Sequence, residues 1–496
     1  MPPVTAPAAG RAKPRFDLDG DGRDELVVGG SASPGGFVLH VRYSGLARRE
    51  VLTAPAIAEP RHYLVPSFTA GDFNGDGFQD LAVASSRMLG QGVFEHGIFV
   101  YDGGSDGLDR SNVRYLPDLH VGAIASGDLN NDGRDELAVS DGGATLDRDG
   151  PFRGSVTVLP GTEDGPTKDG SVEVRQVVAR WQGLAEEDFG NQLAIGDFTG
   201  DGYDDLVVSG FRRGTHEFDS HGMVTLFPGS VRGPSVVDVT KIEGQLDTPG
   251  DTLPVDVMVM SDLDQDGRAD LVLGLPRTSG GKVVHLRGAS SGLTWAGHRT
   301  IDQDTPGVPG QPDDDPTGGS FGYSLATGDA TGDGIPDLLV GAMTMTVGTV
   351  VDAGSVTLIP GTASGPTGAG SFVYTQNAMG SLRRVAPRAR SADAASAVND
   401  RPEPNDYLGS SVAILDLDGT GPLEMLAESK YEDMWEQAPG EPYGLITTLR
   451  LVGPRNFRGV PSPDRLRLVS VQQQRPADFA DADVRTIHFG YRLLGG

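Results

Sequence analysis

The chain carries seven copies of a short acidic motif whose residues could bind a hard cation. Each copy, called a cassette below, has nine residues with the pattern D-x-[DNT]-x-[DT]-G-x-x-[DE]. In chain order the cassettes span residues 17–25, 72–80, 128–136, 197–205, 262–270, 329–337 and 416–424. Oxygen-bearing side chains at positions 1, 3, 5 and 9 can converge on one ion if Gly at position 6 allows a sharp reversal. The spacing therefore predicts a set of cation-binding loops.

The predicted metal ligands are the oxygen-bearing side chains at these four positions, with the position 7 backbone carbonyl as a further ligand. They are Asp17, Asp19, Asp21, Glu25, Asp72, Asn74, Asp76, Asp80, Asp128, Asn130, Asp132, Glu136, Asp197, Thr199, Asp201, Asp205, Asp262, Asp264, Asp266, Asp270, Asp329, Thr331, Asp333, Asp337, Asp416, Asp418 and Glu424. Calcium accepts about six to eight oxygens in irregular geometry, whereas Mg²⁺ demands an octahedron and zinc prefers His and Cys. We therefore expect Ca²⁺ as the cofactor, with up to seven ions.

The individual cassettes differ in their number of carboxylates. The first and fifth have four, so we expect them to bind calcium most strongly. In the seventh, Thr420 replaces the position 5 acid, and we expect that site to be the weakest or empty. Because crowded carboxylates repel without a cation, we expect the metal to be structural.

Other readings of the cassette are less consistent with the sequence. An EF-hand loop needs a bidentate Glu at position 12, but this position is Val or Leu in six cassettes and Ala427 in the seventh. A nine-residue tandem calcium repeat does not fit either, since the cassettes start more than 50 residues apart. A single cassette can also be a metal-free Asx turn, but seven copies in register favour metal.

Each cassette lies inside a longer repeat of β-strand patterns. An apolar segment precedes it, a β-branched run such as DLVVS follows it, and a third strand and a fourth extended segment come next. Four antiparallel strands, repeated at 55 to 87 residues, are typical of a β-propeller. The sequence predicts an all-β, seven-bladed propeller of four-stranded antiparallel blades.

The domain prediction places a flexible tail at residues 1–14 and one propeller domain at residues 15–496. The expected blades are residues 15–64, 66–119, 121–180, 187–245, 253–304, 320–377 and 406–475, approximately, with a closing strand at 485–496. The first repeat lacks its innermost strand, because only KPRF precedes its cassette. The C-terminal Phe489-Gly490-Tyr491 matches Phe321-Gly322-Tyr323 before the sixth cassette. We therefore expect the C-terminal strand to complete blade one and close the ring, rather than form a frayed tail.

Composition excludes several classes of function. The net charge of −29 argues against nucleic acid and anionic membranes as partners. There is no cysteine, so thiolate metal sites and disulfides are excluded, and no apolar run of 18 residues spans a membrane. The N-terminus has no apolar signal region. We favour a processed extracellular protein over a cytoplasmic one, because calcium loops of this kind suit an extracellular medium.

The segments FGNQLAIGDFTGDGYDDLVVSG and FGYSLATGDATGDGIPDLLVGA resemble the FG-GAP repeat of integrin α-subunit propellers and of related secreted bacterial FG-GAP/VCBS-type proteins. The resemblance covers roughly residues 16–496. It implies a seven-bladed propeller with calcium in the loop between the first and second strands of each blade. Only two repeats keep Phe-Gly before the cassette and no RGD sequence is present, so integrin-type adhesion is not implied.

No catalytic residue or organic cofactor is predicted. The two G-x-S-x-G matches, at residues 103–107 and 288–292, fall in the repeated turn after the third strand, so we interpret them as hairpin turns rather than hydrolase elbows. The leading hypothesis is a monomeric, extracellular calcium-binding propeller that binds a protein or glycan as an adhesion or interaction module. The alternatives are a propeller enzyme, such as a polysaccharide lyase or hydrolase with a site at the channel or top face, and a surface-assembly scaffold.

The ligand is expected on the face opposite the cassettes, where longer segments occur at residues 211–221, 302–320, 377–406 and 428–443. The side chains considered for ligand contact are Arg212, Arg213, His216, Tyr431, Trp435 and Tyr443. Trp181 and Trp295 are expected to pack in the core.

Overall fold

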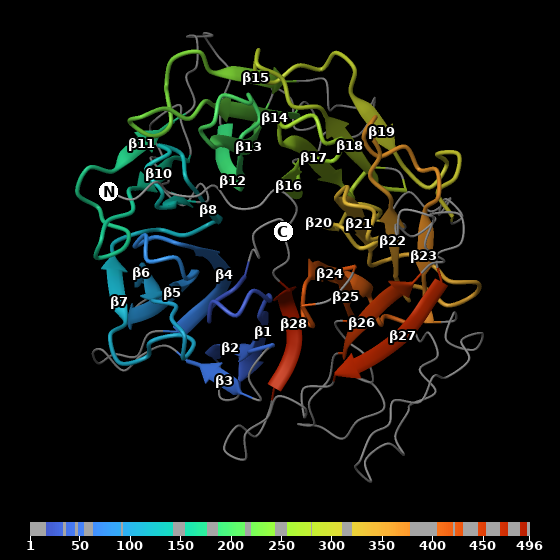
Figure 1. Cartoon of the computed structure of the whole chain (residues 1–496), viewed down its shortest axis with the longest axis horizontal. Coiled ribbons are helices and arrows are strands. Elements are labelled where there is room, and N and C mark those ends of the chain that lie inside the picture. Colours follow the sequence, from blue (N-terminus) through green and yellow to red (C-terminus); the bar gives the residue numbers. More distant parts are fainter. Residues whose placement is uncertain are drawn as a thin grey trace, which may run out of the picture.

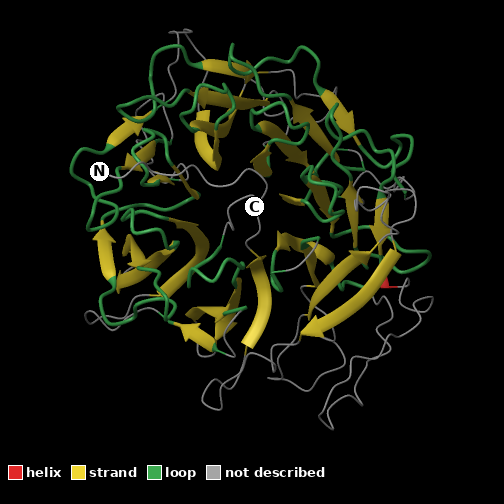
Figure 2. Cartoon of the chain, viewed as in Figure 1, coloured by secondary structure: helices red, strands yellow, loops and turns green. Residues whose placement is uncertain are grey.

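The structure, a computed structural model, is a closed ring of β-sheets (Figure 1). It describes residues 16–32, 36–44, 48–53, 63–90, 93–141, 154–175, 187–213, 220–243, 255–278, 280–309, 320–376, 404–419, 422–429, 445–452, 467–474 and 487–493. These ranges contain strands β1 to β28 and no α-helix (Figure 2). The prediction of an all-β propeller is confirmed.

Five of the sheets have four antiparallel strands each. In chain order they comprise β8 (Ile124–Gly127), β9 (Glu136–Ser140), β10 (Val156–Leu159) and β11 (Val172–Val174); β12 (Glu187–Gly196), β13 (Asp205–Arg213), β14 (Ser220–Phe227) and β15 (Thr240–Glu243); β16 (Val257–Ser261), β17 (Asp270–Leu275), β18 (Lys282–Leu286) and β19 (Arg299–Ile301); β20 (Ser324–Gly328), β21 (Asp337–Ala342), β22 (Ser355–Ile359) and β23 (Phe372–Tyr374); and β24 (Leu408–Leu415), β25 (Glu424–Ser429), β26 (Leu445–Val452) and β27 (Arg467–Gln474). The strand after the cassette is buried along its whole length in β9, β17, β21 and β25. Its β-branched and aliphatic residues pack against neighbouring sheets on both faces.

The remaining sheet has eight strands, so the number of blades differs from the seven that the sequence predicted. It contains β28 (Ile487–Leu493), β1 (Leu26–Ala32), β2 (Gly36–Arg42), β3 (Arg49–Leu52), β4 (Tyr63–Gly71), β5 (Asp80–Gly90), β6 (Val93–Tyr101) and β7 (Arg114–Pro117). A β-sheet pairing between Phe37 of β2 and Leu64 of β4 joins the first two sequence repeats into one sheet. The described strands therefore form six blades, one of them eight strands wide, and the prediction of seven separate blades is wrong.

The predicted closing strand is confirmed. β28 pairs antiparallel with β1, with Ala32 opposite Ile487 and Gly30 opposite Phe489. The C-terminal strand thus supplies the innermost strand that the first repeat lacks, and β28 also lies beside β24 (Figure 1). This pairing covers an edge of β1 that would otherwise be free to pair with another chain.

The hydrophobic core lies between neighbouring sheets rather than at the centre of the ring. One cluster of buried residues joins Leu81 and Phe99 of the eight-stranded sheet to Leu415 and Leu426 of the last sheet. The next cluster along the chain joins Leu137 of β9 to Ala82 of β5, and others link the sheets that follow. The ring is therefore held by sheet-to-sheet packing around its whole circumference.

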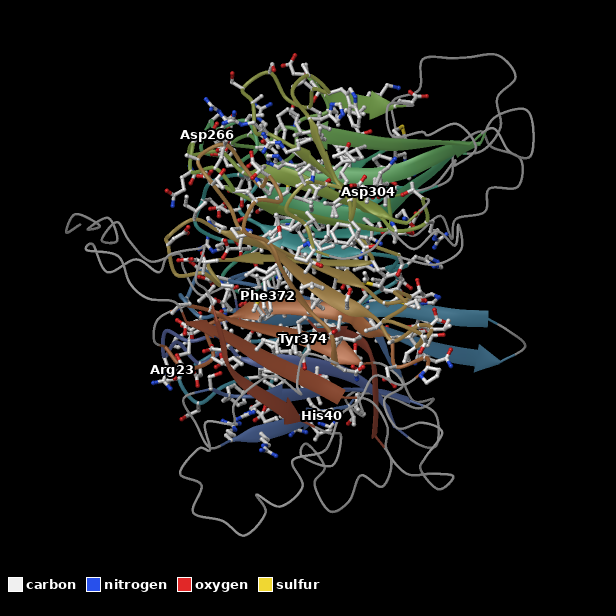
Figure 3. The ribbon with its side chains drawn as sticks, turned by 90° about the vertical axis from the view of Figure 1, so that its right-hand side faces the viewer. Arg23, His40, Asp266, Asp304, Phe372 and Tyr374 are labelled. Atoms are coloured by element: carbon white, nitrogen blue, oxygen red, sulfur yellow. The ribbon has the colours of Figure 1, made fainter. Side chains whose placement is uncertain are left out.

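The cassettes lie at one end of the sheets. Six of them connect an innermost strand to the next strand, as between β12 and β13, and the first leads directly into β1, whose inner neighbour is β28. The antiparallel order therefore puts all of them on the same face. In the side view, Arg23 of the first cassette and Asp266 of the fifth lie at the same edge, while Asp304 lies further toward the other side (Figure 3). This edge is called the cassette face below.

Removing the closing strand tests whether it stabilises the ring. A chain truncated after residue 486 loses β28, so β1 becomes an exposed sheet edge. We expect a melting temperature lower by several degrees or more, and self-association detectable by light scattering. Removal of residues 2–14 is the control and leaves both unchanged. A truncated chain that melts like the full chain and stays monodisperse would contradict the closing role of β28.

Candidate metal centre

Each cassette folds around the carboxylate at position 1. In the second cassette, Asp72 Oδ1 accepts hydrogen bonds from the amides of Gly75 (2.8 Å) and Asp76 (3.1 Å), and Oδ2 accepts one from Gly77 (3.0 Å). The fourth and sixth cassettes repeat this pattern around Asp197 and Asp329. The Asp therefore fixes the loop as well as offering oxygens to an ion.

The glycine at position 6 is required by the backbone. Its φ lies in the left-handed region, for example 93° at Gly77 and 91° at Gly334. Position 4 is left-handed as well, and there Asn131 and Gln265 adopt φ values of 56° and 58°. This second left-handed residue was not part of the predicted pattern.

The carboxylate at position 9 joins two loops of one sheet. In the fourth cassette, Asp205 Oδ2 accepts the Thr199 amide (2.8 Å), while Oδ1 accepts the Gly229 amide (2.9 Å) from the turn after β14. The amides of Gly103 and Gly288 donate in the same way to Asp80 Oδ1 and Asp270 Oδ1, and both N···O distances are 2.9 Å. The G-x-S-x-G segments are thus turns after the third strand, as predicted.

Three of the cassettes bring acidic ligand atoms close together. Ligand oxygens lie within 4.8 Å of one another in the groups Asp17–Asp19–Glu25, Asp262–Asp264–Asp266 and Asp416–Asp418–Glu424. The other four cassettes have Asn or Thr at position 3, and the described residues form no such three-acid group there. The seventh cassette, predicted to be the weakest, thus gathers its three acids, while Thr420 lies outside the described residues.

The oxygens available in the cassettes fit a hard cation. Among the described residues, buried Asp17 Oδ1, Asn130 Oδ1, Glu136 Oε2 and Asp264 Oδ2 have no hydrogen-bond partner, and the last of these forms an ion pair with Arg287. A buried oxygen without a partner costs about 1–3 kcal/mol, and a cation would satisfy it. All of these atoms are oxygens of the type that Ca²⁺ and Mg²⁺ prefer.

Burial also raises the pKa of several cassette carboxylates, most strongly at position 9. Desolvation is the main cause, with repulsion from neighbouring acids adding to it, and it raises the pKa of Glu25 to about 9, of Glu136 to about 8 and of Asp80 to about 7. The pKa of Asp337 is raised well above its ordinary value for the same reasons. The folded loops therefore disfavour ionised carboxylates unless a positive charge compensates them.

Neighbouring cassettes are joined through position 8, which the sequence pattern left unspecified. The amide of Asp135 donates to the carbonyl of Asp72 (2.9 Å), and Asp135 Oδ2 accepts the Asp72 amide in return (2.8 Å). Asp204 makes the same pair of bonds to Asp128. The recurrence of Asp at position 8 in three cassettes was the sequence signal for this contact.

The same contact closes the ring between the first and last cassettes. The Asp24 amide donates to the Asp416 carbonyl (2.9 Å), and Asp24 Oδ2 accepts the Asp416 amide (2.7 Å). Position 8 of the sixth cassette is Pro336, which has no amide hydrogen to donate. There Gln265 Nε2 of the fifth cassette donates to the Gly334 carbonyl instead.

The other side chains named from the sequence are mostly not described. Tyr431, Trp435, His216 and Trp181 lie outside the described residues, as do Tyr443 and the side chains of Arg212 and Arg213. Trp295 is partly buried against the cluster that joins β13 to β17, which confirms its predicted packing role. No helix in the described part of the chain is long and apolar enough to cross a membrane.

Comparisons with known proteins agree with the repeat assignment. A family model described as "FG-GAP-like repeat" matches residues 17–83, and one described as "FG-GAP repeat" matches residues 189–211 and 321–359. Integrin alpha-7 of Rattus norvegicus is 30% identical over 156 residues, which are 31% of this chain and 13% of that protein. Integrin alpha-IIb of Homo sapiens is 29% identical over 168 residues, or 31% of this chain and 14% of that protein.

The chain therefore spans only a small part of the length of these integrins. A solved structure, the Pyrococcus horikoshii acylaminoacyl peptidase, superposes with a TM-score of 0.32 and 8% identity over 80% of this chain and 50% of that one. That similarity is too weak to support an argument about fold or activity.

The raised carboxylate pKa values predict the pH dependence of the metal-free protein. The ordinary pKa of Glu is 4.5, whereas Glu25 and Glu136 titrate near 9 and 8 when folded, so the unfolded chain loses these protons first. The stability that these two groups contribute is therefore fully present below about pH 4.5 and is lost as the pH rises through 8 and 9. We expect the melting temperature of chelator-treated, dialysed protein to fall between about pH 5 and pH 8.

Calcium should oppose the fall of the melting temperature with rising pH, because it binds ionised carboxylates. In saturating calcium we expect the melting temperature to hold or rise over the same range. A metal-free protein whose melting temperature rises with pH would contradict the assigned burial of these carboxylates.

Removing the position 8 carboxylate of the third cassette should lower the stability of the protein. Asp135→Ala removes the acceptor of the Asp72 amide, and we expect the free energy of unfolding in urea to fall by about 1–3 kcal/mol. Gln79→Ala is the matched control, since Gln79 occupies position 8 but reaches Asp17 through its backbone amide. If both variants lost the same free energy of unfolding, the Asp135 side chain would not be what joins the cassettes.

Proposed function

We propose that this FG-GAP repeat protein, which resembles integrin α-subunits, is an extracellular, calcium-stabilised propeller that acts as a ligand-binding module. The proposed domain is a single monomeric unit over residues 15–496. The observation that carries the calcium part is the cluster of Asp17, Asp19 and Glu25, where oxygens converge and one buried Asp17 oxygen lacks a partner. The proposed ligands of each ion are the side chains at positions 1, 3, 5 and 9 of a cassette.

The metal is proposed to be structural. Each cassette draws its oxygens from a loop that is also tied by hydrogen bonds to the next cassette and to a turn of its own sheet. An ion there would stabilise the contacts between sheets. At a dissociation constant of about 0.1 mM and about 1 mM free calcium, each filled site would add about 1.4 kcal/mol to the free energy of unfolding.

The ligand is proposed to bind on the face opposite the cassettes. Two large apolar side chains are exposed at that end of the sheet of β20 to β23: Tyr323, 40% exposed, precedes β20, and Val351, 57% exposed, lies between β21 and β22. Tyrosine is enriched at protein interfaces, where its ring offers contact area and its hydroxyl a hydrogen bond. The integrin resemblance supports a protein ligand, and the exposed aromatic ring is equally suited to stack on a sugar.

A binding screen on arrays of glycans and extracellular proteins, with and without calcium, tests this function. We expect selective retention in calcium that Tyr323→Ala reduces at least several-fold. Val231→Ala is the matched control, because Val231 is 75% exposed but follows β14 at the cassette face. Cleavage of an arrayed glycan, or retention that Val231→Ala weakens more than Tyr323→Ala, would contradict the proposal.

Chelation tests the structural role of calcium. Removing the ions exposes the repulsion among buried carboxylates, so we expect the melting temperature to fall by more than about 10 °C, with recovery when calcium is restored. Magnesium should restore less, because it demands octahedral geometry and retains water. A melting curve that chelation leaves unchanged would refute structural calcium.

A further inference from the structure

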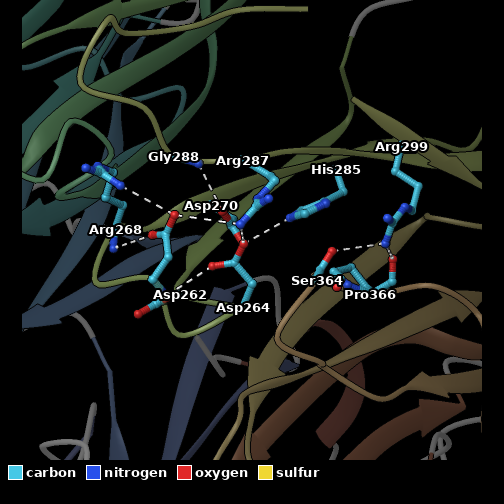
Figure 4. Close-up of polar contacts among 12 residues, drawn as sticks. Asp262, Asp264, Arg268, Asp270, His285, Arg287, Gly288, Arg299, Ser364 and Pro366 are labelled. Atoms are coloured by element: carbon cyan, nitrogen blue, oxygen red, sulfur yellow. Dashed lines mark hydrogen bonds and ion pairs between the residues drawn. The ribbon is translucent and has the colours of Figure 1, made fainter. Parts of the chain in front are cut away.

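The acids of the fifth cassette are paired with an arginine that lies outside the nine residues of the cassette. The guanidinium of Arg287, just after β18, forms an ion pair with Asp264 Oδ2 and lies 3.8 Å from Asp266 Oδ2 (Figure 4). The Asp264 side chain is fully buried, whereas that of Arg287 is 48% exposed. Arg287 therefore approaches from the solvent side and places its charge beside two of the four cassette carboxylates.

A second basic side chain contacts the same cassette. His285 Nε2 forms a hydrogen bond of 3.0 Å with Asp270 Oδ2, and both side chains are buried. The other Asp270 oxygen accepts the Gly288 amide. Both oxygens of the position 9 carboxylate are thus used by groups of the protein.

Both residues depart from the repeat at their positions. The residue before the turn glycine is Pro160, Pro228 or Pro360 in three other repeats, but Arg287 here. Two residues earlier, the buried aliphatic residues Val158, Leu226 and Leu358 correspond to His285. Two separate departures from the repeat therefore converge on one set of carboxylates.

This arrangement does not fit a calcium ion in the fifth cassette. Oxygens of Asp262, Asp264 and Asp266 do lie within 4.8 Å of one another, but two of these acids already face Arg287. A divalent ion would have to displace the guanidinium, break its ion pair with the fully buried Asp264, and meet the repulsion of the displaced cation. The expectation that this cassette binds calcium most strongly counts its four carboxylates but not the arginine beside them.

We propose that Arg287, assisted by His285, takes the place of calcium in the fifth cassette, so that this cassette binds no calcium at the millimolar concentrations that fill the others. This inference rests on the proposed calcium role of the remaining cassettes. It makes the fifth cassette a metal-independent part of the cassette face. It also predicts that one substitution converts it into a calcium site.

The first test counts calcium ions bound per full-length chain by equilibrium dialysis at about 1 mM free calcium. Arg287→Pro restores the residue of the other repeats, and we expect it to bind one more ion than the wild-type chain. Arg287→Gln is a second variant that keeps a longer side chain, with the same expected gain. Arg299→Gln is the matched control, because Arg299 contacts the Ser364 and Pro366 carbonyls and no cassette carboxylate, and its count should not change (Figure 4).

The second test compares the position 1 acids of two cassettes. Asp197→Asn in the fourth cassette should lose one ion, whereas Asp262→Asn in the fifth should lose none in the wild-type background and one in the Arg287→Pro background. Loss of an ion by Asp262→Asn alone, or no gain in either folded Arg287 variant, would overturn the assignment of the fifth cassette. Calcium binding by none of these chains would instead overturn the proposed function.

Discussion

The structure depends on the burial of carboxylates at one end of each pair of strands. The position 1 and position 9 acids hold the loop in shape by accepting backbone amides, as Asp197 and Asp205 do in the fourth cassette. Burial raises the pKa of Asp205 to about 6 and that of Glu25 to about 9. A loop that needs its acids for geometry and disfavours their charge would be stabilised by a compensating cation.

The hydrogen bonds between cassettes extend this local constraint to the whole ring. Position 8 of one cassette contacts position 1 of its neighbour, and the contact between Asp24 and Asp416 joins the two ends of the chain. Such an arrangement couples the cassettes to the packing between sheets. A cation that fixes one loop would also fix the amide and carbonyl that the adjacent loop uses.

Much of this architecture could be predicted from the sequence because it repeats. The spacing of the cassettes, the β-branched runs and the C-terminal match to Phe321-Gly322-Tyr323 predicted a propeller closed by its last strand, and β28 does pair with β1. The blade count failed because a single backbone pairing, between Phe37 and Leu64, merges two repeats, and such a pairing leaves no trace in side-chain patterns. The roles of Asp135 and Arg287 were also missed, because each acts on residues that only the fold brings close.

Metal ions and an internal arginine are proposed to neutralise the cassettes together. The anomalous diffraction of calcium in crystals of the full chain tests this proposal most directly. Our account predicts peaks between Asp17, Asp19 and Glu25 and within other cassettes, and none among Asp262, Asp264 and Asp266. Cassettes without any peak, or a peak of full strength beside Arg287, would contradict it.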